Sequence, residues 1–250
     1  MATAFITGAT SGIGKACAKA LAQQGWNIIA TGRREDNLNN LKSWIEENTS
    51  VKLIPLCFDI SDRQQCESIF ADHQESFKNL KLLINNAGLA KGVDTMDAAH
   101  LDDWEAMIDT NVKGLLYVTR LALDFLKQNA PAQIINIGSV AGRWTYPGGG
   151  VYCATKFAVR ALTEGLRMDL LGKNIRVTNI SPGMVETEFS EVRFSDKEKA
   201  KKVYEGMTPL LAQDIAECVR WAASLPDHVN IQELVVYPTD QASVRDVHRQ

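Results

Sequence analysis

Short apolar runs recur along the chain and alternate with longer stretches of helical periodicity. The runs lie near residues 4–7, 27–31, 51–58, 80–84, 133–137, 175–180 and 234–237. They are rich in Ile, Val and Leu on both faces, which is typical of strands in a parallel sheet that helices cover on both sides. In between, apolar residues recur at threes and fours, as in 101–128. This alternation predicts one α/β domain over 1–250, a Rossmann fold with a doubly wound, seven-stranded parallel sheet.

One segment departs from this pattern. Residues 183–211, between the sixth and seventh predicted strands, form a long polar excursion that contains the charged run SDKEKAKK. The charge run by itself favours a solvated helix. Long excursions from a compact sheet are often functional, so the same segment is also interpreted as a lid over a substrate site.

Composition and charge narrow the class of protein. The chain has 250 residues, 45% of them hydrophobic, and a formal net charge of −3. This composition excludes intrinsic disorder, and the near-neutral balance gives no reason to expect nucleic acid or a membrane surface as a partner. The N-terminal MATAFITGAT lacks the pattern of a secretory signal, and the five cysteines form no CxxC pair, which favours free thiols and a cytoplasmic protein. The four histidines are isolated from one another, so no metal site is expected.

A glycine-rich turn follows the first predicted strand directly. Glycines in such a turn allow unusual backbone angles and a close approach of the backbone to a pyrophosphate. The helix that is expected from about residue 15 would present free N–H groups to the phosphates. The spacing G-xxx-G-x-G differs from the usual G-x-G-x-x-G fingerprint, so the turn alone is a moderate signal. The predicted cofactor-binding residues here are Gly8, Thr10, Ser11, Gly12, Ile13 and Gly14.

Two arginines, Arg33 and Arg34, follow the second predicted strand. In a dinucleotide-binding fold this position meets the adenosine ribose, where an acidic residue suits the 2′-hydroxyl of NAD and arginine suits the 2′-phosphate of NADP. The alternative is that both arginines are surface charges and that Glu35 or Asp36 binds the ribose. Because arginine is electrostatically unfavourable near a helix N-terminus, a phosphate partner is the better explanation, and NADP is the predicted cofactor.

Tyr152 and Lys156 are four residues apart and share one face of a predicted helix. A phenol is a weak base at neutral pH, but a nearby ammonium favours the phenolate and lowers the pKa of the phenol. Such a pair can take a proton from an alcohol or return it to a carbonyl. The spacing alone is common, and a surface Tyr–Lys contact would produce it as well.

Taken together, the motifs resemble those of the short-chain dehydrogenase/reductase family over essentially the whole chain. The sequence contains that family's TGxxxGxG at 7–14, NNAG at 85–88, a serine at Ser139, YxxxK at 152–156 and PG at 182–183. Five motifs in this order, each after a predicted strand or on the following helix, are specific as a set. The resemblance implies an oxidoreductase that acts on CH–OH donors.

The resemblance also implies roles for individual residues. Tyr152 would be the general acid/base, Lys156 would lower the pKa of Tyr152 and hold the nicotinamide ribose, and Ser139 would orient the reacting oxygen. Asn111 would anchor a water that relays protons to Lys156. Further cofactor contacts are implied for Asp59, Ile60, Asn86, Ala87, Gly88, Asn111, Pro182, Gly183, Val185 and Thr187.

Within the family, segments such as NNAGLAKG, MIDTNVKGL and VRFSDK resemble those of NADP-dependent 3-hydroxy acid dehydrogenases. That branch oxidises L-allo-threonine, serine and related acids such as 3-hydroxyisobutyrate, and reduces malonic semialdehyde. A carboxylate substrate requires a cationic site near Tyr152, and Arg143 and Arg193 are the candidates. The alternative for Arg143 is a surface or interface position.

Other interpretations remain open. The chain could reduce small aldehydes, diketones or other carbonyls, or it could be a non-catalytic sensor of NADPH. The resemblance implies a homotetramer built as a dimer of dimers. The tail 246–250 is expected either to reach a neighbouring subunit or to fray.

Overall fold

The computed structural model describes all residues from Met1 to Gln250 and has the predicted α/β architecture. Seven strands form one parallel sheet in the order β3-β2-β1-β4-β5-β6-β9. Each apolar run of the sequence becomes one of these strands. They are β1 (Thr3–Thr7), β2 (Asn27–Gly32), β3 (Leu53–Cys57), β4 (Leu80–Asn85), β5 (Ala132–Ile137), β6 (Ile175–Pro182) and β9 (Glu233–Val236).

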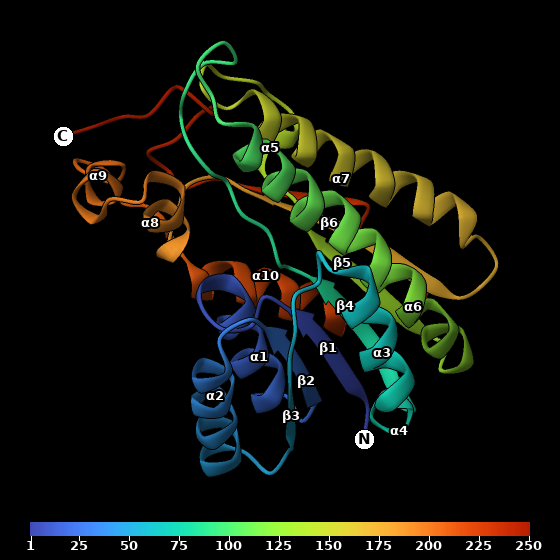
Figure 1. Cartoon of the computed structure of the whole chain (residues 1–250). Helices are drawn as coiled ribbons and strands as arrows, with labels where there is room; N and C mark the ends of the chain where they lie inside the picture. The colour runs from blue at the N-terminus through green and yellow to red at the C-terminus, as the bar shows by residue number, and fades with distance from the viewer.

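Helices cover both faces of the sheet (Figure 1). One face packs against α1 (Gly12–Gln23), α2 (Glu35–Asn48) and α10 (Ala212–Ser224), and the other against α3 (Arg63–Asp72), α4 (Gln74–Phe77), α6 (Leu115–Gln128) and α7 (Gly150–Asp169). The sheet therefore separates two apolar cores, because its strands carry buried side chains on both faces. None of the helices combines the length and the apolar content that crossing a bilayer requires.

The long helix expected over 101–128 has an irregular centre. It consists of α5 (Leu101–Ile108), a π-helical segment (Asp109–Gly114) and α6 without a break in the chain. A π-helical turn inserts an extra residue and rotates the side chains that follow. The irregular segment contains Asn111, so it lies where the sequence places a site residue.

The excursion between β6 and β9 folds as a separate layer beside the sheet. It contains β7 (Val185–Glu186), α8 (Glu188–Phe194), α9 (Lys197–Lys202) and β8 (Leu210–Leu211), and β7 pairs with β8 in parallel. We call residues 183–211 the lid, after the role interpreted from the sequence, which stays a prediction. The charged run forms α9, which begins at a cap in which the Asp196 carboxylate accepts hydrogen bonds from the N–H groups of Glu198 and Lys199. Figure 1 shows α8 and α9 beside the C-terminal tail and away from the sheet.

Candidate active site

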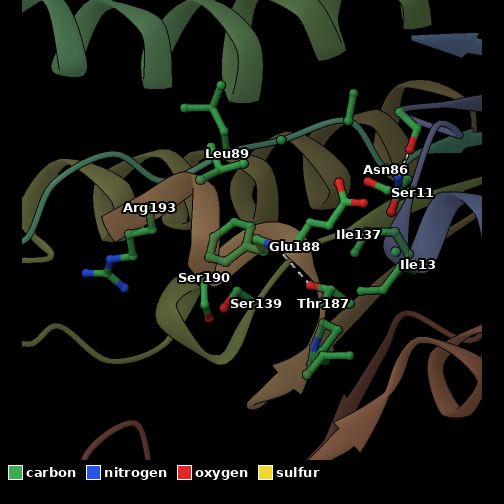
Figure 2. Close-up of a pocket in the computed structure, with 18 of the residues that line it drawn as sticks. Ser11, Ile13, Asn86, Leu89, Ile137, Ser139, Thr187, Glu188, Ser190 and Arg193 are labelled. Atoms are coloured by element: carbon green, nitrogen blue, oxygen red, sulfur yellow. Dashed lines mark hydrogen bonds between the residues drawn. The ribbon is translucent and has the colours of Figure 1, made fainter. Parts of the chain in front are cut away.

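A cavity of about 600 Å³ lies where the carboxyl ends of the strands meet the lid. In Figure 2, Ser11, Ile13 and Asn86 gather at one end, and Ser139, Ser190 and Arg193 lie toward the other. Most residues predicted from the sequence line this cavity: Gly8, Thr10, Ser11, Gly12, Ile13, Arg33, Arg34, Asp59, Ile60, Asn86, Ala87, Gly88, Ser139, Tyr152, Lys156, Pro182, Gly183, Val185, Thr187 and Arg193. Gly14, Asn111 and Arg143 are not in its lining.

The glycine turn is tightly built, and Gly14 is part of its packing rather than of its surface. A β-carbon at Gly14 would lie 2.4 Å from the carbonyl oxygen of Gly8, so no other residue fits there without a shift of the backbone. Gly8 itself has a φ of +67°, a conformation that favours glycine. Helix α1 begins at Gly12, earlier than expected, and the Ser11 side chain does not cap it. The first N–H groups of α1 therefore remain available to an anionic ligand.

The NNAG segment fixes the glycine turn from the neighbouring strand. The Thr7 hydroxyl oxygen accepts hydrogen bonds from the backbone N–H groups of Asn86 and Ala87, both at 3.0 Å. In return, the Asn86 amide donates to the carbonyl oxygens of Thr7 and Gly8 at 2.9 and 3.1 Å. These reciprocal bonds hold the ends of β1 and β4 together, which explains why two distant motifs line one site.

Arg33 and Arg34 lie just before α2, whose first turn carries the acidic residues Glu35 and Asp36. Arg33 forms an ion pair with Asp59 at 3.4 Å. Arg34 donates from Nε and Nη2 to the Thr10 hydroxyl and from Nη1 to Glu188 at 2.8 Å. Both arginines therefore line the cavity beside the glycine turn, as a 2′-phosphate site requires, while neither Glu35 nor Asp36 lines it.

Tyr152 and Lys156 project from α7 into the cavity, where both side chains are buried. The Lys156 Nζ donates to the carbonyl oxygen of Ile137 at 2.9 Å and lies 6.0 Å from the centroid of the Tyr152 ring. Burial lowers the pKa of Lys156 to about 8.

The pKa of the Tyr152 phenol moves in the direction opposite to the one expected from Lys156 alone. Burial raises it well above its usual range, and the nearby Tyr146 adds to the rise. A hydrogen bond from Ser139 and the charge of Arg193 lower the same pKa, but they offset only part of the effect of burial. Desolvation is therefore the dominant influence on this phenol in the protein alone.

Ser139 follows β5 and begins a short 3-10 helix (Val140–Gly142) as its N-cap. Its hydroxyl oxygen accepts a hydrogen bond from the backbone N–H of Ala141 at 3.1 Å, which leaves the O–H free to donate. The cap orients this hydroxyl toward Tyr152 from a rigid position at the end of a central strand.

Asn111 lies behind the cavity wall and connects two of its parts. Its Oδ1 accepts from the backbone N–H of Leu89, and its Nδ2 donates to the carbonyl oxygen of Leu89 and to the Thr155 hydroxyl. Gly88 separates Asn111 from Lys156: a β-carbon at Gly88 would lie 3.2 Å from the Asn111 Oδ1 and 3.5 Å from the Lys156 Nζ. Asn111 therefore ties the loop after β4 to α7. The water relay that the resemblance implies stays a prediction.

The two candidate substrate arginines have different surroundings. Arg193, on α8, donates to the Tyr146 hydroxyl at 3.0 Å, and its guanidinium carbon lies 5.9 Å from the centroid of the Tyr152 ring. Arg143 is held outside the cavity by Glu233 on β9, to which it donates two hydrogen bonds. The structure thus brings Arg193, and not Arg143, close to Tyr152.

Several cavity residues, in the lid and in the segment after β9, carry no signal in the sequence. Glu188, Tyr204, Gln241 and Val244 all line the cavity. The Gln241 Oε1 accepts from the backbone N–H of Met184 at 2.8 Å. No motif or periodicity marks these positions, and the partners of Glu188 and Gln241 are 154 and 57 residues away.

The C-terminal tail lies against the lid of its own chain. The Arg249 guanidinium donates to the carbonyl oxygens of Val203 and Glu205. The backbone N–H of Gln250 donates to the carbonyl oxygen of Gly206 at 2.8 Å. The tail is thus ordered by contacts within this chain, in contrast to the frayed terminus considered from the sequence.

Comparison with known proteins places the chain in a family. The family model for short chain dehydrogenases matches residues 2–198. The chain is 45% identical over 240 residues to sulfoacetaldehyde reductase 2 of Chromohalobacter salexigens, covering 95% of this chain and 94% of that protein. It is 44% identical over 249 residues to the NADP-dependent 3-hydroxy acid dehydrogenase YdfG of Escherichia coli K12, covering 98% of this chain and 99% of that protein. The chain therefore belongs to the short chain dehydrogenase family.

Solved structures agree with this assignment. The closed form of serine dehydrogenase complexed with NADP⁺ superposes with a TM-score of 0.91 at 43% identity and covers 99% of this chain and 100% of that one. An alcohol dehydrogenase from Thermococcus sibiricus, complexed with 5-hydroxy-NADP, gives a TM-score of 0.85 at 28% identity and covers 97% of this chain and 98% of that one. The fold is thus that of an NADP-dependent oxidoreductase of this family.

Proposed function

We propose that this chain transfers hydride between NADP(H) and a small 3-hydroxy acid, with Tyr152 as the general acid/base. The observation that carries the proposal is the arrangement of three groups in one cavity: the Tyr152 phenol, the Ser139 hydroxyl and the Arg193 guanidinium. The first two suit the reacting carbinol, and the third suits a carboxylate attached nearby.

NADP is the cofactor that the cavity fits. The uncapped start of α1 and the tight turn at Gly14 can accept the pyrophosphate. Arg33 and Arg34 supply positive charge where an acidic residue would otherwise meet the ribose 2′-hydroxyl. Several relatives are named as NADP-dependent, and the serine dehydrogenase structure contains NADP⁺.

When bound, the cofactor supplies the acceptor or donor of the hydride. In the oxidative direction, the Tyr152 oxygen takes the proton of the substrate hydroxyl as the carbinol C–H bond breaks and a C=O bond forms. Ser139 donates a hydrogen bond to the same substrate oxygen, and the Lys156 Nζ holds the nicotinamide ribose. In the reductive direction, Tyr152 returns the proton to the carbonyl oxygen.

Arg193 is the proposed carboxylate-binding residue. Three of its N–H groups donate to Tyr146, Gly92 and Gly148. A guanidinium has five such donors, so two remain for a substrate. Because its place is fixed by the side chain and backbone of other segments, Arg193 can orient a short acid with its 3-hydroxyl toward Tyr152.

A second candidate is the reduction of a small sulfonated aldehyde. A guanidinium binds a sulfonate through the same donors that bind a carboxylate, and one relative is named sulfoacetaldehyde reductase. Both candidates depend on Arg193, and they differ only in the anionic group.

The deciding experiment is a spectrophotometric assay of NADP⁺ reduction with L-allo-threonine, serine and 3-hydroxyisobutyrate, with NAD⁺ in parallel. The reverse assay follows NADPH oxidation with malonic semialdehyde and sulfoacetaldehyde. Turnover of a hydroxy acid with NADP⁺ supports the proposal, whereas turnover of sulfoacetaldehyde alone selects the second candidate. Turnover of uncharged aldehydes or diketones alone would contradict both.

We propose that the protein assembles as a homotetramer. We also propose that it is located in the cytoplasm. Exposed apolar side chains such as Leu116 on α6 and Phe157 on α7 support contact between subunits. Sedimentation equilibrium at micromolar concentration tests this assembly, and a monomer would contradict it.

A further inference from the structure

Arg34 is shared between the glycine turn and the lid. Its Nε and Nη2 donate to the Thr10 hydroxyl at 3.4 and 3.1 Å, and its Nη1 donates to the Glu188 carboxylate at 2.8 Å. Glu188 is the first residue of α8, 154 positions later in the sequence. The residue before it, Thr187, lies against Gly12, because a β-carbon at Gly12 would be 3.3 Å from the Thr187 methyl group. The start of α8 therefore contacts the cofactor end of the cavity at two points.

The Arg34–Glu188 pair contributes little to the stability of the fold. The two side chains are 47% and 49% exposed, and ion pairs in such surroundings are screened by solvent. Glu188 nevertheless lines the cavity and, in Figure 2, points away from the α8 backbone between Leu89 and Ile137. An acidic side chain beside the arginine that would bind a phosphate calls for an explanation other than stability.

A 2′-phosphate and Glu188 compete for the same guanidinium. The phosphate carries a charge of about −1.5 to −2 at neutral pH, so it is attracted to Arg34 and repelled by the Glu188 carboxylate. Arg34 has two donors left for the phosphate, but a phosphate bound there lies close to the Glu188 carboxylate, so its binding favours a Glu188 that has turned away. A dinucleotide without the 2′-phosphate leaves the Arg34–Glu188 pair in place.

We propose that Glu188 is a specificity-determining residue that opposes the binding of a 2′-phosphate at Arg34 and thereby links cofactor binding to the first turn of the lid. The inference rests on the proposed function in one respect, the assignment of the 2′-phosphate to Arg34. Linkage is reciprocal: the free energy by which Glu188 weakens phosphate binding equals the free energy by which the bound phosphate weakens the Arg34–Glu188 contact.

The test uses fragments of the cofactor, so that binding is measured without turnover. The dissociation constants of adenosine 2′,5′-bisphosphate and adenosine 5′-phosphate are measured by isothermal titration calorimetry on the full chain. The variants are Glu188→Gln and the matched control Glu191→Gln. Glu191 is an exposed carboxylate of the same helix and does not line the cavity.

Glu188→Gln is expected to tighten the binding of the bisphosphate about three- to tenfold, as expected for removal of one nearby like charge. The dissociation constant of the monophosphate is expected to stay within about twofold, and Glu191→Gln to change neither. An unchanged or weaker affinity of Glu188→Gln for the bisphosphate would overturn the inference, as would an equal gain in both variants. If the unmodified chain does not prefer the bisphosphate to the monophosphate, the NADP assignment itself is wrong, and the role of Glu188 falls with it.

Discussion

The two walls of the cavity are built in different ways. The wall at the sheet edge consists of strand ends and α7, and its functional groups are fixed by buried hydrogen bonds such as Lys156 to Ile137 and Asn111 to Leu89. The lid wall consists of short helices whose contacts are partly exposed, such as Arg34 to Glu188 and Arg193 to Tyr146. The difference teaches that the proposed proton-transfer groups are placed by the core of the fold, whereas Glu188 and Arg193, which are proposed to select ligands, belong to a layer with more exposed contacts.

The largest effect is expected at the sheet wall. Tyr152→Phe removes the oxygen that is proposed to transfer the proton and keeps the ring, so kcat is expected to fall about 10²- to 10⁴-fold. The affinity for NADPH, measured by fluorescence titration, is expected to change little. A variant that keeps its turnover would show that a group other than Tyr152 moves the proton. The proton-transfer group could then not be assigned to the sheet wall.

The pH dependence tests the same wall. Because burial raises the pKa of Tyr152, the phenolate form is a minority throughout pH 7–9. In the proposed mechanism oxidation needs this form, so its rate is expected to rise with pH, by up to about tenfold per unit. Reduction needs the protonated phenol, which is already the main form, so its rate is expected to depend only weakly on the ionisation of Tyr152. Initial rates in both directions over this range provide the check, and an oxidation rate independent of pH would contradict it.

The lid wall is expected to control KM. Arg193→Ala removes the proposed charged donor to the substrate, so kcat/KM for hydroxy acids is expected to fall about 10- to 100-fold, mostly through KM. Arg143→Ala is the matched control, because Arg143 is engaged by Glu233 outside the cavity. Steady-state kinetics of both variants distinguish the two arginines. Equal losses of kcat/KM in both variants would show that the position of Arg193 in the cavity does not determine substrate binding.

The smallest effect concerns stability at the edge of the sheet. The Glu233 side chain is 11% exposed, and although burial raises its pKa, hydrogen bonds from Arg143 and the charges of Arg143 and Arg160 hold the pKa below its ordinary value. Glu233→Gln is expected to lower the free energy of unfolding by about 1–3 kcal/mol at pH 7. Because the pKa is lowered on folding, this contribution is present above the ordinary pKa of glutamate and is lost as pH falls through the folded value. Urea unfolding at pH 7 and near pH 4 measures the difference, which should shrink in acid.

The sheet wall could be predicted from the sequence, while much of the lid wall could not. Strands and the glycine turn leave local signals, so the positions of Gly8, Ser139 and Tyr152 followed from apolar runs and short motifs. Glu188 lies 154 residues from Arg34, and its contact leaves no periodicity or spacing. The same reason explains why the sequence could not distinguish Arg143 from Arg193: the partner of Arg143 is 90 residues away on β9.

Desolvation is the other quantity that motifs do not show. The spacing of Tyr152 and Lys156 indicates that they share a helix face, but it does not reveal how deeply both are buried. In the structure burial outweighs the neighbouring charges and raises the pKa of the phenol. Two residues that share a helix face can therefore be recognised from the sequence while the direction of the pKa shift of the phenol is missed.

The position of β1 has a consequence for how the chain is made. This strand is complete by Thr7, yet it lies in the middle of the sheet between β2 and β4, and all five of its residues are buried. The backbone edge that pairs with β4 has no partner until Leu80–Asn85 is synthesised, and the stretch from Thr7 to Asn85 takes roughly 4–16 s at typical translation rates. During that interval the nascent chain carries an apolar strand with an open edge, so the ribosome-bound protein is expected to need shielding by chaperones more than the finished one does.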